Sequence, residues 1–220
     1  MTLNNNTHSE FDHVAVAAAW AHGWTLARDK LAPVPQAYGH KIDLGAPDHL
    51  ERHVVANANA DMQALRALAG SLTRPGTWLK VCASVDTVAP LLPAGWSVQP
   101  PEYLMAVALR QAGAITHNDY RLSLRTSDAV SDAELRDKDG QLAASGRVAL
   151  SNGYAIFDQV VTDPAHRRKG LGRIIMAALS ELAIAGASST GVLVATEEGR
   201  ALYEAIGWRL VSPVTAAVLA

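Results

Sequence analysis

The chain has 220 residues, a formal net charge of −2 at pH 7 and a pI of about 6.4. This nearly neutral balance excludes the overall basic signature of nucleic-acid-binding or membrane-surface proteins, so we expect neither kind of partner. The N-terminus has no cationic leader region, and its apolar run at residues 14–21 is too short to span a bilayer. We therefore expect a soluble cytoplasmic protein. The single cysteine, Cys82, cannot form an internal disulfide and is expected to be a buried, unreactive thiol.

The first half of the chain contains a strand–helix–strand pattern that returns in the second half. Residues 81–84 and the pair Gly95-Trp96 match residues 193–196 and the pair Gly207-Trp208 at an offset of 112. An internal repeat is the economical interpretation, with chance similarity between two such units as the alternative.

Upstream the offset changes, because residues 53–57 resemble residues 159–163 at an offset of 106. The difference of six residues falls where the second copy holds Arg-Arg-Lys-Gly-Leu-Gly, so the first copy is predicted to lack that loop. The first copy also has Leu91 in the place of Tyr203. We predict that residues 1–110 form a degenerate half without a cofactor site, and that residues 111–220 form the functional domain.

Two hairpin turns divide the start of the second half. Asp139-Gly140 and Asn152-Gly153 are strong turn signals, and they separate strand-like runs at 131–137, 141–150 and 154–162. These runs predict an antiparallel meander that leads directly into a basic loop.

That loop, from Val160 to Arg173, combines a proline turn, three consecutive cations and Gly-x-Gly before a helix. Glycines let backbone approach a ligand closely, and a helix N-terminus presents unpaired N–H groups with a partial positive charge. The pattern predicts a phosphate or pyrophosphate site. The spacing fits neither a P-loop nor a dinucleotide-binding fingerprint, and the alternative interpretation is a solvated basic turn that opens a helix.

Helical spacing of apolar residues follows from Ile174 to Ala183, and Gly186 can end this helix. Residues 192–195 predict a buried strand, after which Thr196 can cap a second helix that ends at Gly207, before a strand at 208–211. A crossover of this length makes the strands at its two ends parallel, so the sheet is predicted to be mixed.

Two motifs together resemble the GNAT superfamily of acetyl-CoA-dependent N-acetyltransferases, over roughly residues 131–212. The first is Arg167-x-x-Gly170-x-Gly172; the second is Thr196-x-x-Gly199-x-x-Leu202-Tyr203, followed by Gly207-Trp208. Thr196 and Gly199 depart from the family's Asn and Ala, but they keep a polar group and a small residue. The resemblance implies an α/β (α+β) fold: a mixed twisted sheet flanked by helices, with the degenerate repeat in the N-terminal half.

The resemblance also implies the residues that bind acetyl-CoA. The backbone of the incoming strand would pair with the pantetheine amides, the loop would hold the pyrophosphate, and one face of the second helix would lie against the pantetheine arm. The predicted binding residues are Val160, Val161, Thr162, Arg167, Arg168, Lys169, Gly170, Leu171, Gly172, Arg173, Thr196 and Gly199. No metal site is expected.

The reaction implied is direct attack of an amine on a thioester within a ternary complex, without a covalent intermediate. A primary amine with a pKa of about 10.4 must lose a proton, and Asp158, on the strand that enters the loop, is the candidate base. The family's usual strand acid would fall nearer Ile156, which shares a strand face with Asp158. Tyr203 is placed near the sulfur, where it can protonate the leaving thiolate.

The acceptor is expected to be the primary amine of a small molecule or peptide. The alternative function is a non-catalytic acyl-CoA-binding or sensing module on the same fold. Residues 111–130 are too short and polar for the helices that shape an acceptor pocket. Either the N-terminal half supplies that wall, or the first strand of the domain lies at 103–110. The apolar tail at 215–220 is interpreted as an edge strand that could pair within a homodimer.

Overall fold

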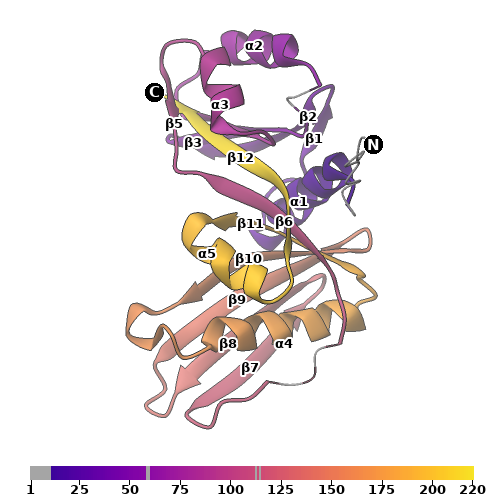
Figure 1. Ribbon diagram of the computed structural model, residues 1–220, viewed down its shortest axis with the longest axis vertical. Helices are drawn as coiled ribbons and strands as arrows, with labels where there is room; N and C mark the ends of the chain where they lie inside the picture. Colours follow the sequence, from indigo (N-terminus) through magenta and orange to yellow (C-terminus); the bar gives the residue numbers. More distant parts are fainter. Residues whose placement is uncertain (1–10, 58–59, 112, 114) are drawn as a thin grey trace, which may run out of the picture.

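The computed structural model describes residues 11–220 except 58–59, 112 and 114, and its strands form one continuous sheet (Figure 1). The twelve-stranded sheet has the order β1-β2-β3-β4-β12-β6-β11-β10-β9-β8-β7, and β5 pairs with β12 off this path. The prediction of a mixed twisted sheet flanked by helices is confirmed.

Among its described residues, the N-terminal half contributes one long helix, two short helices, a 3-10 turn and six strands. They are α1 (His13–Ala27), β1 (Val34–Gln36), β2 (Gly39–Ala46), β3 (His49–Val55), α2 (Met62–Ser71), β4 (Thr77–Val81), α3 (Val85–Val88), η1 (Ala89–Leu91), β5 (Trp96–Val98) and β6 (Glu102–Ala108).

From β8 onward, the C-terminal half follows the order that the sequence predicts, whereas β7 was not predicted. It contains β7 (Tyr120–Ser127), β8 (Val130–Asp137), β9 (Leu142–Ser151), β10 (Tyr154–Thr162), η2 (Pro164–His166), α4 (Leu171–Ala185), β11 (Thr190–Thr196), α5 (Glu197–Ala205) and β12 (Arg209–Leu219). The meander of β8, β9 and β10 is antiparallel, and β10 and β11 are parallel, as expected.

The internal repeat is confirmed by strand pairing. In each half a crossover helix joins two parallel strands, β3 to β4 through α2 and β10 to β11 through α4. Downstream the register repeats at the expected offset of 112: Val98 pairs with Ala217 and Leu210 pairs with Met105, so both members of the first pair are related to the second by this offset.

The expected upstream offset of 106 is wrong. Lys80 pairs with Val54, and Val192, which lies 112 residues after Lys80, pairs with Ile156; Val54 and Ile156 are therefore equivalent, at an offset of 102. The second connection is thus ten residues longer than the first rather than six. Part of this length is a longer crossover helix, since α4 has 15 residues and α2 has 10.

The two halves exchange their last strands. Strand β6 leaves the N-terminal half and pairs with β11 and with the first part of β12, whereas the second part of β12 returns to pair with β4 and β5. The interpretation of residues 215–220 as an edge strand is therefore wrong, because these residues lie in the middle of the sheet. Their apolar character is explained by burial within the same chain, and it gives no support to a dimer.

Helix α1 lies on the opposite face of the sheet from α2 and α4. Asp12 caps it, with Oδ1 accepting from Val14 N at 2.9 Å, and its apolar residues pack on Ile42, Leu104 and Ile156 from both halves. These residues form one hydrophobic core under α1. Helix α4 covers a second core and α2 covers a third core, both on the other face of the sheet. The N-terminal half thus supplies the wall over β10 and β11, and β6 is a central strand rather than the first strand of the C-terminal domain.

No helix in the part of the chain that the structure describes is long and apolar enough to cross a bilayer. Cys82 is buried, and burial raises the pKa of its thiol to about 12, which is consistent with an unreactive side chain.

Candidate functional site

Strands β10 and β11 separate after three paired residues. They pair only from Tyr154 to Ile156 against Thr190 to Val192, while β10 continues against β9 and β11 continues against β6. A bulge between Asp158 and Val161, where Gln159 has a φ of 54°, bends β10 away. The facing edges of 157–162 and 193–196 therefore have no strand partner among the described residues. We call this region the β10–β11 opening.

The N-terminus of α4 lies at the end of this opening, and no side chain caps it. Gly170 is the N-cap residue with a left-handed φ of 77°, and a Cβ atom at this position would meet nothing within 4 Å. No side chain therefore fills the N-cap position, which lies at the positive end of the helix. This arrangement fits the predicted anion site.

The cations of the loop are exposed, and two of them are held by neighbouring side chains. Arg167 Nη1 lies 3.0 Å from Glu198 Oε1 on α5, and Lys169 Nζ lies 3.1 Å from the Tyr120 hydroxyl on β7. Arg168 adopts a left-handed φ of 65°, and Arg173 extends from the first turn of α4. No sequence pattern marks Glu198 or Tyr120 as partners of these cations, because they lie 31 and 49 residues away along the chain.

The remaining loop residues act through backbone or packing. Leu171 is buried in the core below α4, so only its main chain faces the loop. Gly172 lies where α4 meets α5, because a Cβ atom there would be 2.9 Å from Leu202 Cδ2. Residues Val160, Val161 and Thr162 form the β10 edge of the opening, and Val161 is 59% exposed.

The second motif builds the start of α5. Thr196 Oγ1 accepts a hydrogen bond from Gly199 N at 3.2 Å, which confirms the predicted cap. A Cβ atom on Gly199 would be 3.2 Å from Tyr203 Cε2. The small residue at 199 is therefore explained by the ring of Tyr203 itself.

Tyr203 is buried on the α4 side of the sheet, with its ring centroid 5.9 Å from that of Trp208. Burial, together with the negative charge of Asp158, raises the pKa of the Tyr203 hydroxyl to about 12. Tyr203 therefore stays protonated at neutral pH and can act as a hydrogen-bond donor.

Asp158 lies across the opening from Tyr203, on the α1 side. Arg28, at the C-terminal end of α1, holds both carboxylate oxygens: Nε lies 2.7 Å from Oδ2 and Nη2 lies 3.1 Å from Oδ1. Nothing in the sequence predicted this bidentate pair, whose members are 130 residues apart. The structure thus brings the two candidate catalytic residues to one opening, but with Asp158 already paired.

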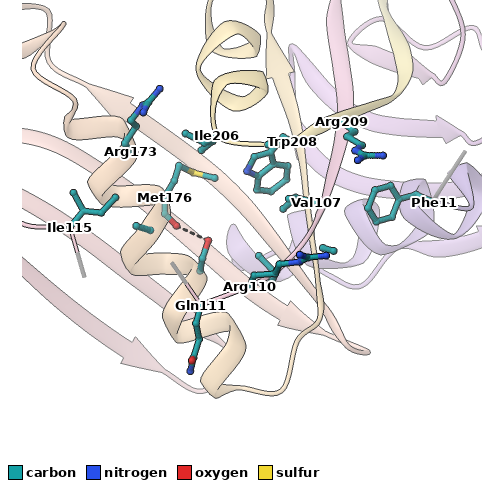
Figure 2. A pocket seen from close by; sticks show the side chains of 15 residues that line it. Phe11, Val107, Arg110, Gln111, Ile115, Arg173, Met176, Ile206, Trp208 and Arg209 are labelled. Atoms are coloured by element: carbon teal, nitrogen blue, oxygen red, sulfur yellow. Dashed lines mark hydrogen bonds between the residues drawn. The ribbon is translucent and has the colours of Figure 1, made fainter. Parts of the chain in front are cut away.

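Two cavities flank the site on opposite faces of the sheet. One of about 540 Å³ lies beside α4, where Figure 2 shows Met176, Ile206 and Trp208 around it; among the predicted site residues only Arg173 lines it. The other, of about 420 Å³, lies on the α1 side and is lined by charged and polar residues that include Asp132, Arg147 and Gln159. This second cavity borders the strand that carries Asp158. The described residues contain no group of three or more potential metal ligands.

Comparison with known proteins finds a family model for part of the chain. A family model of the acetyltransferase (GNAT) domain matches residues 133–210. No curated protein matches the sequence.

The structure is similar to a GCN5-related N-acetyltransferase from Kribbella flavida, at 14% identity, with 96% of each chain covered and a TM-score of 0.64. A GNAT-family acetyltransferase from Novosphingobium aromaticivorans is similar at 17% identity, with 95% of this chain and 100% of that chain covered and a TM-score of 0.57. A tandem GNAT protein from the clavulanic acid biosynthesis pathway is similar at 14% identity, with 80% of this chain and 76% of that chain covered and a TM-score of 0.51. The family model thus identifies a GNAT acetyltransferase domain at residues 133–210, and the structural similarities show that the chain as a whole has the GNAT fold.

Proposed function

We propose that the protein is an N-acetyltransferase that moves the acetyl group of acetyl-CoA to the primary amine of a small molecule or peptide. The observation that carries this proposal is the β10–β11 opening, which joins an uncapped helix N-terminus to a buried, protonated tyrosine. Acetyl-CoA supplies the activated acyl group as a thioester.

The residues at the opening fit this cosubstrate. The N–H groups at the start of α4, with Arg168, Lys169 and Arg173 nearby, would hold the pyrophosphate. The free edge of β10 at 160–162 would accept the pantetheine amides as an added strand, and an N–H there would polarise the thioester carbonyl.

Asp158 is the proposed base for the acceptor ammonium. Because Arg28 occupies both of its oxygens, the acceptor must displace or share one of these hydrogen bonds before a proton can be taken. The pair therefore orients the carboxylate toward the α1 side of the opening. We propose that the acceptor enters from this side.

Tyr203 is the proposed donor to the leaving sulfur. Its pKa of about 12 lies well above the value of about 8.5 for a thiol, so complete proton transfer to the thiolate is uphill. A hydrogen bond to the developing negative charge, from a donor fixed by packing on Trp208, is therefore its main contribution.

Release of free CoA thiol from acetyl-CoA, measured across a panel of primary amines, tests the proposal. We expect an amine-dependent rate that exceeds hydrolysis. The mass of the acetylated amine should account for the thiol released. No acceleration by any amine, despite tight acetyl-CoA binding, would contradict the enzyme and support a non-catalytic acyl-CoA-binding module, an alternative that the paired state of Asp158 favours.

A further inference from the structure

Five charged side chains converge on the α1 face of the sheet where the two halves meet. They come from the end of α1, from β3, β4 and β6, and from β10: Arg28, Arg52, Lys80, Glu102 and Asp158. We call them the junction cluster. The cluster exists only because the two halves share one sheet and α1 lies across both.

Four of the five members form two ion pairs. Arg28 holds Asp158 at 2.7 Å, and Lys80 contacts Glu102. Arg52 is the remaining member. Within the described part of the chain it has neither an ion pair nor a hydrogen bond, although only 7% of its surface is exposed, and its Nε is buried without a partner.

The contacts of Arg52 do not neutralise its charge. Its Cζ lies 4.1 Å from the centroid of the Trp24 indole, and Arg28 Cζ lies 4.8 Å from the same ring. A buried guanidinium without an anionic partner is costly, and burial lowers the pKa of Arg52 to about 10. The cluster therefore carries one excess positive charge in a place where water cannot solvate it well.

One added monoanion would balance this charge. A carboxylate matches the planar fork of a guanidinium with two parallel hydrogen bonds, whereas a dianionic phosphate would leave an excess negative charge in the cluster. Arg52 is linked to the candidate base through Trp24 and Arg28, so an anion at Arg52 would lie on the side from which the acceptor reaches Asp158.

We propose that Arg52 binds a carboxylate of the acceptor, so that the substrate is a small amine that also carries a carboxylate group. This inference rests on the proposed acetyl transfer for its kinetic consequences, but binding of the carboxylate does not depend on transfer. Recognition would then use the degenerate half for the acceptor and the C-terminal half for acetyl-CoA.

The first test measures binding without acetyl-CoA. Melting temperature and calorimetric titration are recorded with ω-amino acids from glycine to 6-aminohexanoate and with their carboxamides. We expect at least one amino acid, and no carboxamide, to raise the melting temperature of the full chain. Absence of stabilisation by every amino acid would overturn the proposal.

Two substitutions separate recognition from structure. Arg52→Met keeps the packing on Trp24 but removes the charge, so we expect an unchanged or higher melting temperature without ligand and no response to the amino acids. Arg52→Lys keeps the charge but loses the fork, and we expect at least about a tenfold weaker response. Arg66→Met, on exposed α2, is the control and should respond like the wild type. A large fall in melting temperature for Arg52→Met, or a full response from it, would show that Arg52 is structural.

The second test compares kcat/KM for each amino acid and its carboxamide. The wild type should prefer the carboxylate by at least about tenfold, mainly through KM, and Arg52→Met should lose this preference. An equal preference in the variant would contradict the inference while the acetyltransferase function stands. Transfer to no amine, with carboxylate binding retained, would instead contradict the proposed function alone.

Discussion

The two halves of the protein contain the same strand–helix–strand unit. They differ in how far its parallel strands pair and in whether a side chain caps its crossover helix. In the first half, β3 and β4 pair through five residues to the end of both strands, and the Asp61 carboxylate caps α2 by accepting from Ala64 N at 2.8 Å. In the second half, β10 and β11 pair through three residues, and Gly170 leaves α4 without a side-chain cap.

This difference indicates that the repeated unit alone does not make the cosubstrate site that we propose. The proposed site needs two local changes, the separation of the parallel strands and an open helix N-terminus. A carboxylate at the start of α2 already occupies the place that an anionic ligand would take. The first half is therefore suited to other roles, which include supplying α1 and the junction cluster.

The largest effect should come from breaking the strand that both halves share. Ala217 on β12 is fully buried and pairs with Leu79 and Val98. Ala217→Asp buries a charge without a partner, so we expect a loss of about 4 kcal/mol or more in the free energy of unfolding. Denaturant unfolding followed by tryptophan fluorescence measures this loss.

If the halves are one cooperative unit, acetyl-CoA binding should disappear in the same transition. The control is Leu210→Asp, because Leu210 lies near the start of β12 and is 43% exposed. This substitution should lower the free energy of unfolding by about 1 kcal/mol or less. An Ala217→Asp protein that loses only the first half, while acetyl-CoA binding persists, would show that the halves fold independently.

The second prediction makes the start of α4 resemble that of α2. Gly170→Asp places a carboxylate at the open N-terminus, and we expect acetyl-CoA affinity to fall by about 100-fold because the negative charge repels the pyrophosphate. Gly170→Asn has the same size and also tolerates a left-handed φ, so it isolates the charge. Isothermal titration calorimetry gives both affinities; equal losses in the two variants would assign the effect to shape rather than charge.

The third prediction concerns the position where the first half has Leu91. Tyr203→Phe keeps the ring packed on Trp208 but removes the donor, so we expect kcat to fall by about 10- to 100-fold with little change in acetyl-CoA affinity. Tyr103→Phe is the matched control, because the Tyr103 hydroxyl donates a hydrogen bond to Glu197 on α5, the helix that also carries Tyr203. Normal turnover in Tyr203→Phe would remove the tyrosine from the mechanism.

The smallest effect is a pH dependence located in the first half. Burial lowers the pKa of His53, although the hydrogen bond to Glu51 opposes this. The unfolded chain then binds a proton more readily than the folded one, so stability is lost as pH falls below about 6.5. His53→Gln should reduce this acid-induced fall in melting temperature by about 1–2 °C. A fall between pH 7.5 and 5 that is unchanged in the variant would assign acid sensitivity to other groups.

Local signals in the sequence predicted much of the C-terminal half. Asp139-Gly140 and Asn152-Gly153 marked the hairpins, Thr196 marked the start of α5, and Gly186 the end of α4. These features depend on turn geometry, capping and helical spacing, which involve residues close together in the chain. The left-handed conformation of Gly170 is also a local feature, but it was not predicted from the sequence.

Features that depend on residues far apart in the chain could not be predicted from the sequence. The pairing of Asp158 with Arg28 joins two segments 130 residues apart, and no motif marks either partner for the other. The apolar tail of β12 looked like an edge strand because buried central strands and exposed apolar edges have the same composition. The upstream repeat offset was wrong by four residues because the bulge and the longer α4 change the register without a clear sequence signal.

The sequence by itself determined the repeated unit, the open helix N-terminus and the tyrosine helix, since each follows from short-range chemistry. The tertiary structure alone decided that the halves exchange strands, that α1 covers the proposed acceptor side, and that the buried Arg52 has no ion pair among the described residues. The physical reason is that strand order, burial and ion pairing are set by which distant segments pack together.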